Sequence, residues 1–592
     1  MPVPVIPAPA ASRDGGSRGS RPSTGDLLAY ASYVILALFV TGLLWLNPAG
    51  RVHATNESDH AFFHWAFAHA AKALSEGTNP LADRVLNAPE GVNLMANTSV
   101  LAFAIPLTPV TLWLGPGVSY LIALTLGFAA TAAAWYWLLS RHVVASRAAA
   151  FLGAALCGFG PGALSQGNGH PNLVAQFLVP FIAWQALRLR HGRPLRRGLI
   201  LGALVTVQAF INEEVLFLTA LGLGVFVLTW AVLRRDEARQ YWKPMLTGLA
   251  IAAALAFGVL AYPLWYQFFG PYHYRGVPAG IEHYGADIAS FPAFGRGSFL
   301  GDPVAANRLS ANPAEENTFY GWPLLVALLV TGVVLWRSTL VKALTVTGLT
   351  LAALSLGPKV MAYGQNTSVP GPWRALHKLP LFDTVVPVRV ALFVLPIAGI
   401  LTALGVQLAL TRTTPGTTAR RLACTAIAIA LVPLTPVPLR VAKRPIPGFI
   451  ADGTWRAYVH SGESLVTIPV AGSAYADGMR WGAATGLEFR LAGGYFLGPG
   501  GGDGRSLFGP PPRPSTKLFA VAYKTGEAPD VSDADREAAA ADLAYWRAGA
   551  VVMAPLHSNV VDREDKEDAL LRTASALYGE PSRIGGLWVW DR

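Results

Sequence analysis

Two carboxylates near the N-terminus are the first residues that suggest chemistry. Glu57 and Asp59 precede a stretch in which helical spacing places Phe62, Trp65 and His69 on one stripe. This pattern predicts a helix lying on a membrane surface, with Asp59 at its start. A carboxylate there can take a proton from a substrate hydroxyl. The alternative role of Asp59 is to cap the helix, and the two roles are compatible.

A second acidic pair, Glu213 and Glu214, lies between two apolar runs. Charges so close to hydrocarbon are costly and often functional. The pair forms either a solvated turn or part of a site that binds a metal or an acceptor.

His170 lies in the short turn Gly169-His170-Pro171. Histidine titrates near neutral pH, so His170 can contact a phosphate or move a proton. The alternative is an ordinary polar turn residue.

A third acidic pair, Glu315 and Glu316, precedes the aromatic segment Phe319-Tyr320. One interpretation is an interfacial helix start, whose acidic first turn suits the helix dipole. The other is a pair that contacts a donor substrate or a metal.

Arg389 follows Pro387 at the start of an apolar run. Arginine binds phosphate with two hydrogen bonds, and Lys359, Arg374 and Lys378 lie in the preceding loop. These cations predict a basic pocket for an anionic lipid head group. The alternative is that Arg389 extends to the membrane interface.

The amino-acid composition indicates a membrane protein. Of 592 residues, 53% are hydrophobic and only 14% charged, against about 25% charged in soluble proteins. The net charge of +11 is spread along an apolar chain, which indicates membrane topology and excludes a nucleic-acid partner. Two cysteines exclude a disulfide framework and a multi-cysteine metal site.

Runs of about 20 apolar residues predict the membrane spans. Eleven are expected, at 27–46, 117–139, 148–164, 172–189, 197–211, 215–233, 244–266, 320–336, 339–357, 388–411 and 422–439. The run 98–114 is short and contains two prolines, so we predict that it inserts only partly, on the outer face. With that choice the Lys- and Arg-rich loops between spans all lie inside, as membrane proteins prefer.

This topology predicts three regions. Residues 1–26 form a disordered cytoplasmic tail, and 27–440 form a multi-pass plasma-membrane domain with outer loops 47–116, 267–319 and 358–387. Residues 441–592 form an extracytoplasmic α/β domain. Within it we expect strands at 465–470, 551–553 and 587–590 and helices at 563–577 and 533–547, the last capped by Ser532.

The residues described above resemble those of the GT-C superfamily, the membrane glycosyltransferases that use polyprenyl-phosphate sugars, and in particular actinobacterial members. The resemblance rests on the outer-loop acid Asp59, on Gly169-His170-Pro171, on Glu213-Glu214 and Glu315-Glu316, and on Pro387-Val388-Arg389. It covers most of the chain.

The resemblance implies an inverting glycosyltransferase that acts on an extracytoplasmic hydroxyl of a glycan, lipid or protein. Asp59 would be the base with Glu57 as the alternative, and Arg389 and His170 would contact the donor phosphate. Lys359, Arg374 and the acidic pairs are further binding candidates, and a divalent metal is left open. Two other functions are a transporter of lipid-linked saccharides and a non-catalytic glycan-binding protein.

Overall fold

The computed structural model describes residues 23–500 and 504–591. The chain divides into two compact units. Unit 1 comprises residues 1–42, 123–257 and 282–439, and unit 2 comprises residues 43–122, 258–281 and 440–592. The predicted tail 1–26 lies outside the described residues as far as residue 22, and the first helix begins at Thr24.

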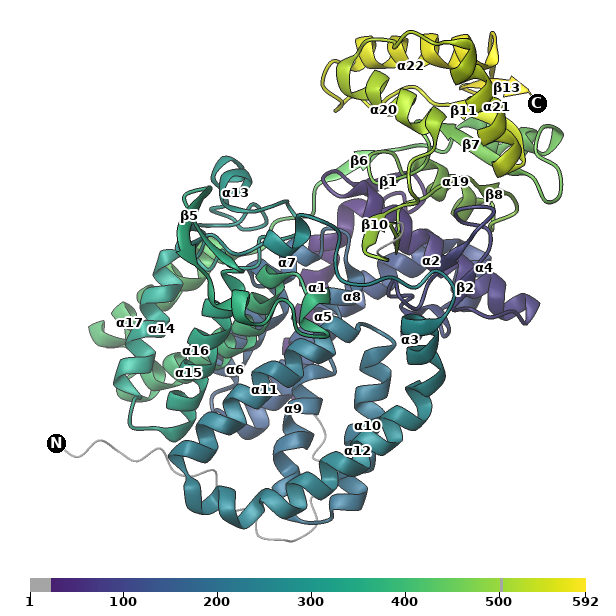
Figure 1. The fold of residues 1–592 in the computed structure, drawn as a ribbon. Helices are drawn as coiled ribbons and strands as arrows, with labels where there is room; N and C mark the ends of the chain where they lie inside the picture. Colours follow the sequence, from purple (N-terminus) through teal and green to yellow (C-terminus); the bar gives the residue numbers. More distant parts are fainter. Residues whose placement is uncertain (1–22, 501–503, 592) are drawn as a thin grey trace. The chain divides into compact units, whose positions relative to one another are not determined.

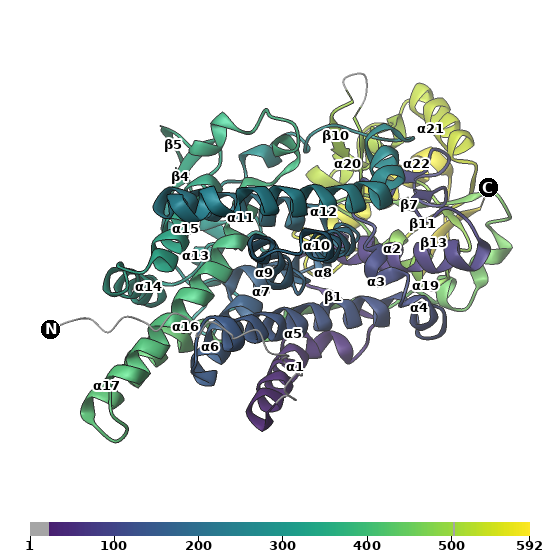
Figure 2. The ribbon, with the colours of Figure 1, turned by 90° about the horizontal axis from the view of Figure 1, so that it is seen from below.

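Unit 1 consists mainly of helices (Figure 1). Those that lie mainly in it are α1 (Thr24–Trp45), α5 (Pro116–His142), α6 (Arg147–Phe159), α7 (Pro161–Gln166), α8 (Pro171–Val174), α9 (Val179–Arg188), α10 (Pro194–Ala209), α11 (Glu213–Leu233), α12 (Arg235–Phe269), α13 (Pro303–Leu309), α14 (Trp322–Val334), α15 (Thr339–Ser355), α16 (Val394–Arg412) and α17 (Thr418–Leu431). The 3-10 helix η6 (Pro387–Phe393) leads into α16. Both ribbon views show α14, α15, α16 and α17 as neighbours (Figures 1 and 2).

Each of the eleven predicted apolar runs carries helix. Among the described residues, seven helical segments are long and apolar enough to cross a membrane, and α14 and α15 are shorter apolar helices. The run 98–114 divides into α3 (Leu101–Ala104) and α4 (Thr108–Leu114), and neither reaches the length of a span. The prediction of a helical multi-pass membrane protein is therefore confirmed.

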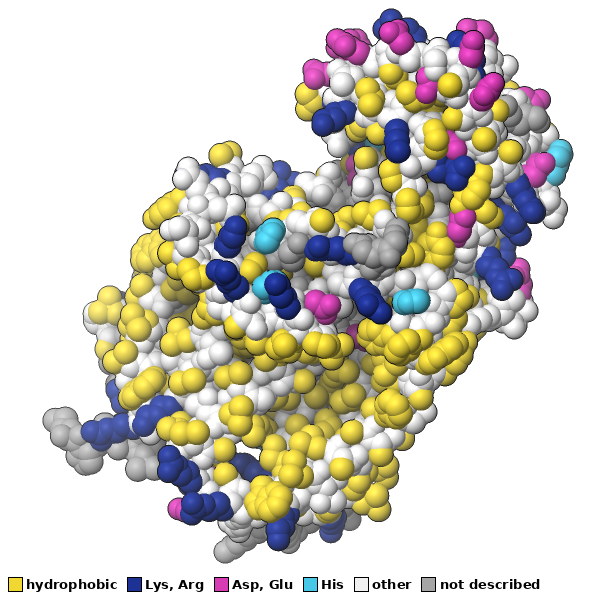
Figure 3. Space-filling model, in the orientation of Figure 1, with side chains coloured by type: hydrophobic (Ala, Val, Ile, Leu, Met, Phe, Trp, Pro, Cys, Tyr) yellow, Lys and Arg dark blue, Asp and Glu magenta, His cyan; other side chains and the backbone are white. Residues whose placement is uncertain are grey.

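Many apolar side chains lie on the surface of unit 1. Few residues of α11 and α12 are buried, and Leu228 and Phe257 are among their exposed apolar side chains. Hydrophobic side chains cover much of the visible surface of unit 1, whereas acidic side chains gather over α20–α22 (residues 514–578) of unit 2 (Figure 3). Exposed apolar faces of this size suit a lipid environment.

Unit 2 contains a five-stranded mixed sheet with strand order β12-β13-β11-β7-β8. The strands are β7 (Ser464–Ile468), β8 (Arg490–Leu491), β11 (Ala548–Met553), β12 (Ser582–Ile584) and β13 (Leu587–Asp591). β7 and β11 are parallel, and β13 is antiparallel to β11. The helices α20 (Pro514–Thr525), α21 (Asp533–Trp546) and α22 (Arg563–Tyr578) pack beside it around a core that includes Phe519 and Trp546.

The first loop predicted to lie outside the membrane, residues 47–116, is part of the same unit. Its strand β1 (Arg51–His53) pairs antiparallel with β6 (Val441–Lys443). Its helix α2 (Glu57–Glu76) packs against α19 (Asp477–Ala484), α3 and α4. The C-terminal region and the first outer loop therefore share one core.

α2 does not lie on a surface, and the prediction of a surface helix was wrong. Phe62, Trp65 and His69 are all buried. Trp65 donates to Asp83 Oδ2 at 2.5 Å, and α19 approaches so closely that a Cβ at Gly482 would lie 2.5 Å from the Trp65 ring. The stripe that suggested a membrane interface is covered by a segment more than 400 residues later in the chain.

Candidate functional site

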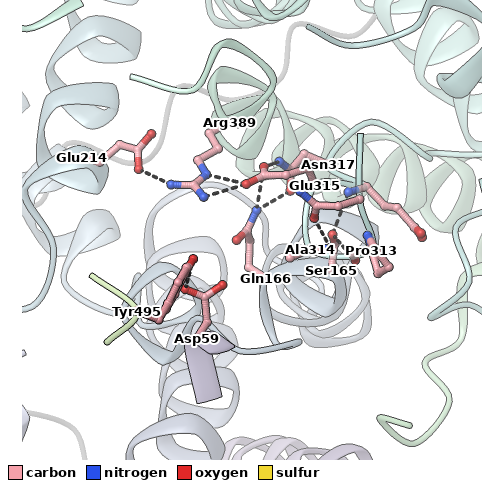
Figure 4. A network of polar contacts seen from close by, with 12 residues as sticks. Asp59, Ser165, Gln166, Glu214, Pro313, Ala314, Glu315, Asn317, Arg389 and Tyr495 are labelled. Atoms are coloured by element: carbon pink, nitrogen blue, oxygen red, sulfur yellow. Dashed lines mark hydrogen bonds and ion pairs between the residues drawn. The ribbon is translucent and has the colours of Figure 1, made fainter. Parts of the chain in front are cut away.

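Asp59 is held in the first turn of α2. The helix begins at Glu57, and its cap is Asn56, whose side chain accepts from the Asp59 backbone N–H at 3.4 Å. Asp59 therefore does not cap the helix. Its carboxylate is partly buried and accepts a hydrogen bond from the hydroxyl of Tyr495 at 3.2 Å (Figure 4).

Tyr495 is positioned by a hairpin of the C-terminal region, formed by β9 (Leu497–Pro499) and β10 (Ser506–Phe508). Its ring stacks on Phe508 with centroids 5.6 Å apart. Asn97 of the first outer loop exchanges two hydrogen bonds with the backbone of Leu497. The loop and the hairpin together fix the tyrosine beside Asp59.

Glu57, the alternative base, is engaged differently. Both of its carboxylate oxygens accept from Arg444, at 2.6 and 2.9 Å. The side chain of Arg444 is only 7% exposed, and it also donates to Asn559. Both oxygens of Glu57 are held by one guanidinium, which leaves less room for an acceptor hydroxyl to approach, so the geometry favours Asp59 over Glu57.

A second ion pair adjoins this one. Asp477 of α19 contacts Arg480 at 2.9 Å and His557 Nε2 at 2.8 Å. Burial alone would raise the pKa of the Asp477 carboxyl, but the hydrogen bond from His557 and the charge of Arg480 hold that pKa below its ordinary value. Asp477 is therefore ionised at neutral pH.

Glu57, Asp477 and His557 have ligand atoms within 4.8 Å of one another, the arrangement of a metal site. The charges argue against a metal. Arg444 and Arg480 already neutralise the two carboxylates, so a divalent cation would leave two uncompensated positive charges in a largely buried place. These residues form an ion-pair network, here called the Glu57 network, that joins α2 to the C-terminal region.

Two histidines continue along α2 from Asp59. His60 and His64 are buried, with ring centroids 4.2 Å apart. Burial, the Arg480 charge and His53 lower the pKa of His64 to about 3, and burial lowers the pKa of His60 well below its ordinary value. Both imidazoles are neutral at pH 7.

Unit 1 contains a separate polar group around Arg389 (Figure 4). The guanidinium donates to Glu315 at 2.6 and 2.8 Å and to Glu214 at 2.8 Å. Gln166 of α7 donates to Asn317 at 2.9 Å, and Asn317 donates to Glu315 at 3.0 Å. We call these five residues the Arg389 cluster.

The acidic pair 315–316 does not open a helix, and that interpretation was wrong. α14 begins at Trp322 with Gly321 as its cap. Glu316 is buried, and its carboxylate accepts from the backbone and the side chain of Arg296. Its own backbone N–H donates to Ser165 Oγ at 2.7 Å. Each glutamate of the pair thus binds its own arginine.

The other predicted residues are more dispersed. Glu213 follows Asn212, the cap of α11, and His170 is a buried residue at the start of α8. Lys359 and Arg374 are exposed, the first on the strand β4 (Lys359–Ala362). The predicted contact of Arg389 with a phosphate stays a prediction, since its guanidinium binds two carboxylates here.

Sequence reasoning missed Gln166 in unit 1. It also missed five residues near Glu57 and Asp59: Tyr495, Arg444, Asp477, Arg480 and His557. Each lies in the C-terminal region, hundreds of residues from Glu57 and Asp59. None belongs to a short motif. The only sequence signal was the placement of charged residues in a region predicted to lie on the same side as the first loop.

Comparisons with known proteins agree with this fold. The chain is similar to the arabinofuranosyltransferase AftD from Mycobacteria, with 15% identity and a TM-score of 0.51 over 96% of this chain and 39% of that one. It is also similar to the archaeal oligosaccharyltransferase AglB from Archaeoglobus fulgidus, with 12% identity and a TM-score of 0.48 over 89% of this chain and 69% of that one. A search of curated proteins finds no match. The predicted GT-C-like fold is confirmed.

Residues 29–433 match a family model described as a domain of unknown function, DUF6311, and the chain belongs to this family.

Proposed function

We propose that the protein is a membrane glycosyltransferase that moves a sugar from a polyprenyl-phosphate donor to an extracytoplasmic acceptor hydroxyl, in a cell-envelope glycan. The observation that carries the proposal is the partly buried Asp59 carboxylate, fixed by Tyr495 at the start of α2. The GT-C-like fold and the exposed apolar helices support it. A prenyl chain would partition into the same bilayer as those helices.

In the proposed reaction Asp59 accepts the proton of the acceptor hydroxyl. The acceptor oxygen then forms a bond to the anomeric carbon while the bond from that carbon to the phosphate oxygen breaks. The polyprenyl phosphate leaves with the electron pair. A single displacement of this kind inverts the anomeric configuration.

We assign the donor to residues of unit 1. Arg389, Glu214 and Glu315 form a fixed polar cluster, with Glu213, Glu316 and His170 near it in sequence. Lys359 and Arg374 are exposed cations available to a lipid phosphate. We assign no metal to the Glu57 network, because its arginines already balance its carboxylates.

The proposed orientation places the N-terminus in the cytoplasm and the C-terminal region outside the plasma membrane. It is supported by the short basic segments, such as Arg193, Arg196 and Arg197 at the start of α10, which membrane proteins retain inside.

The test is transfer in proteoliposomes containing the full-length protein, a panel of labelled polyprenyl-phosphate sugars and envelope glycan acceptors. We expect a covalent product from the wild type and a loss of at least about 100-fold in Asp59→Asn. Asp302→Asn is the matched control, because Asp302 only caps α13, and it should retain activity. Undiminished transfer by Asp59→Asn, or lipid crossing without any new bond, would contradict the proposal.

A further inference from the structure

The Arg389 cluster contains buried acceptor oxygens that no residue of the cluster satisfies. Glu315 receives Arg389 on one oxygen and Asn317 on the other. Glu214 accepts from Arg389 on Oε2, while its Oε1 is buried and has no hydrogen-bond partner among the described residues. Within the same part of the chain, Gln166 Oε1 is also buried without a partner, and the whole Gln166 residue is buried.

The orientation of the Gln166 amide follows from its neighbours. The Asn317 amide nitrogen donates to Glu315, so the Asn317 oxygen requires a donor. Gln166 Nε2 supplies it at 2.9 Å. The other end of the Gln166 amide must therefore be its oxygen, and that oxygen is an acceptor awaiting a donor.

Unfilled buried acceptors are costly. An unsatisfied buried polar group destabilises a protein by about 1–3 kcal/mol, and more if it is charged. Such groups in native proteins usually have partners. Two of them around one fixed guanidinium indicate a place built for a ligand.

The charges decide which ligand fits. The cluster carries two carboxylates against one guanidinium and presents only oxygens, so a phosphate would be repelled. A divalent cation would lie beside Arg389, which is already within 2.8 Å of both carboxylates. A neutral ligand with several O–H donors is repelled neither by the carboxylates nor by the guanidinium.

We infer that the Arg389 cluster binds hydroxyl groups of the transferred sugar, with Gln166 Oε1 and Glu214 Oε1 as the accepting atoms. The inference rests on the proposed function and assigns a different part of the donor to this cluster: the sugar ring, and not the phosphate. Arg389 acts by holding Glu214 and Glu315 in place. A site built to accept a hydroxyl discriminates strongly against ligands that lack it.

The test uses two substitutions that preserve size. Glu214→Gln turns an accepting oxygen into a donating amide, and Gln166→Met removes the amide. Gln185→Met is the matched control, because Gln185 is another buried glutamine of unit 1 and its side chain donates to the Arg197 carbonyl. Variants are compared only if their melting temperatures lie close to that of the wild type.

Binding is measured on full-length protein in nanodiscs with undecaprenyl phosphate and with its glucose-, mannose- and arabinose-linked forms. We expect both variants to bind the preferred sugar-linked lipid at least about tenfold more weakly, with unchanged binding of the sugar-free lipid. Equal weakening for both lipids would show that the cluster contacts the phosphate and would overturn the inference. An equal effect in Gln185→Met, or no effect in either variant, would overturn it too.

A second measurement separates this inference from the proposed function. If the wild type binds no polyprenyl phosphate, the proposed function fails, and the cluster is then tested with millimolar free glucose, mannose and arabinose. Stabilisation of the wild type by one of these sugars, lost in Gln166→Met and kept in Gln185→Met, would support a sugar site. No stabilisation by any of them would overturn it.

Discussion

Two clusters of charge occupy the interior of this protein, and they differ in balance. In the Glu57 network of unit 2, Glu57 and Asp477 face Arg444 and Arg480. In the Arg389 cluster of unit 1, Glu214 and Glu315 share a single arginine. One set of charges is neutral, and the other has an excess of one negative charge.

The two groups of residues also differ in what their remaining polar atoms bind. In the Glu57 network, guanidinium donors that do not bind a carboxylate bind the backbone: Arg480 also donates to the carbonyls of Arg444 and Ala49. In the Arg389 cluster, Gln166 Oε1 and Glu214 Oε1 remain as accepting oxygens. In the balanced network most donors bind carboxylates or backbone carbonyls and so fix chain segments, although Arg480 Nε has no hydrogen-bond partner among the described residues. The unbalanced cluster retains accepting oxygens for a ligand.

The largest stability effect should come from removing the shared arginine. Arg389→Met removes the one cation that the Glu214 and Glu315 carboxylates share in this cluster, and it should destabilise the protein by about 3–5 kcal/mol, measured by denaturant unfolding in detergent. Adding Glu315→Gln should recover part of the loss. A double variant less stable than Arg389→Met would show that the ion pair is not what the arginine supplies.

A smaller loss is expected in the balanced network. Arg444→Met should cost about 2 kcal/mol, because Glu57 is 24% exposed and water can replace part of the interaction. The control is Arg456→Met, which breaks an exposed pair with Glu488 and should cost less than about 1 kcal/mol. Equal losses in the two variants would mean that the Glu57 network is no stronger than a surface pair.

Acid should weaken the region that holds Asp59. The pKa of His64 is about 3 in the fold and near 6.5 in the unfolded chain, so unfolding takes up a proton between these values. The free energy of unfolding is therefore highest above pH 6.5. As pH falls from 6.5 toward 3, protonation of His64 in the unfolded chain lowers this free energy by up to about 1.4 kcal/mol per pH unit. Unfolding free energies measured from pH 7 to pH 4 should fall less steeply in His64→Leu. An identical slope in both proteins would refute this.

The smallest effect concerns the start of α2. Asn56→Ala removes the cap and should cost about 1 kcal/mol, as Ser532→Ala should at α21, whose cap accepts from Asp535. If α2 is held mainly by the Glu57 network, transfer activity should survive Asn56→Ala better than Arg444→Met. The reverse order would make the cap the main determinant of Asp59 placement.

Local elements of the fold were predictable from sequence because their causes are local. The helix expected at 533–547 exists as α21, with Ser532 as its cap, and the apolar runs all carry helix. The partners of Glu57 and Asp59 were not predictable. Arg444 lies 387 residues from Glu57 and Tyr495 lies 436 residues from Asp59, so no short spacing joins them. The burial of α2 was not predictable for the same reason, because α19, which packs against α2, lies more than 400 residues later in the chain.

The most direct test of the account compares Glu57→Gln with Asp59→Asn in the proteoliposome transfer assay, with each rate corrected for the folded fraction. Both oxygens of Glu57 accept from Arg444, and we propose Asp59 as the base. The account predicts a loss of at least about 100-fold in Asp59→Asn and less than about tenfold in Glu57→Gln. A larger loss in Glu57→Gln than in Asp59→Asn would contradict it.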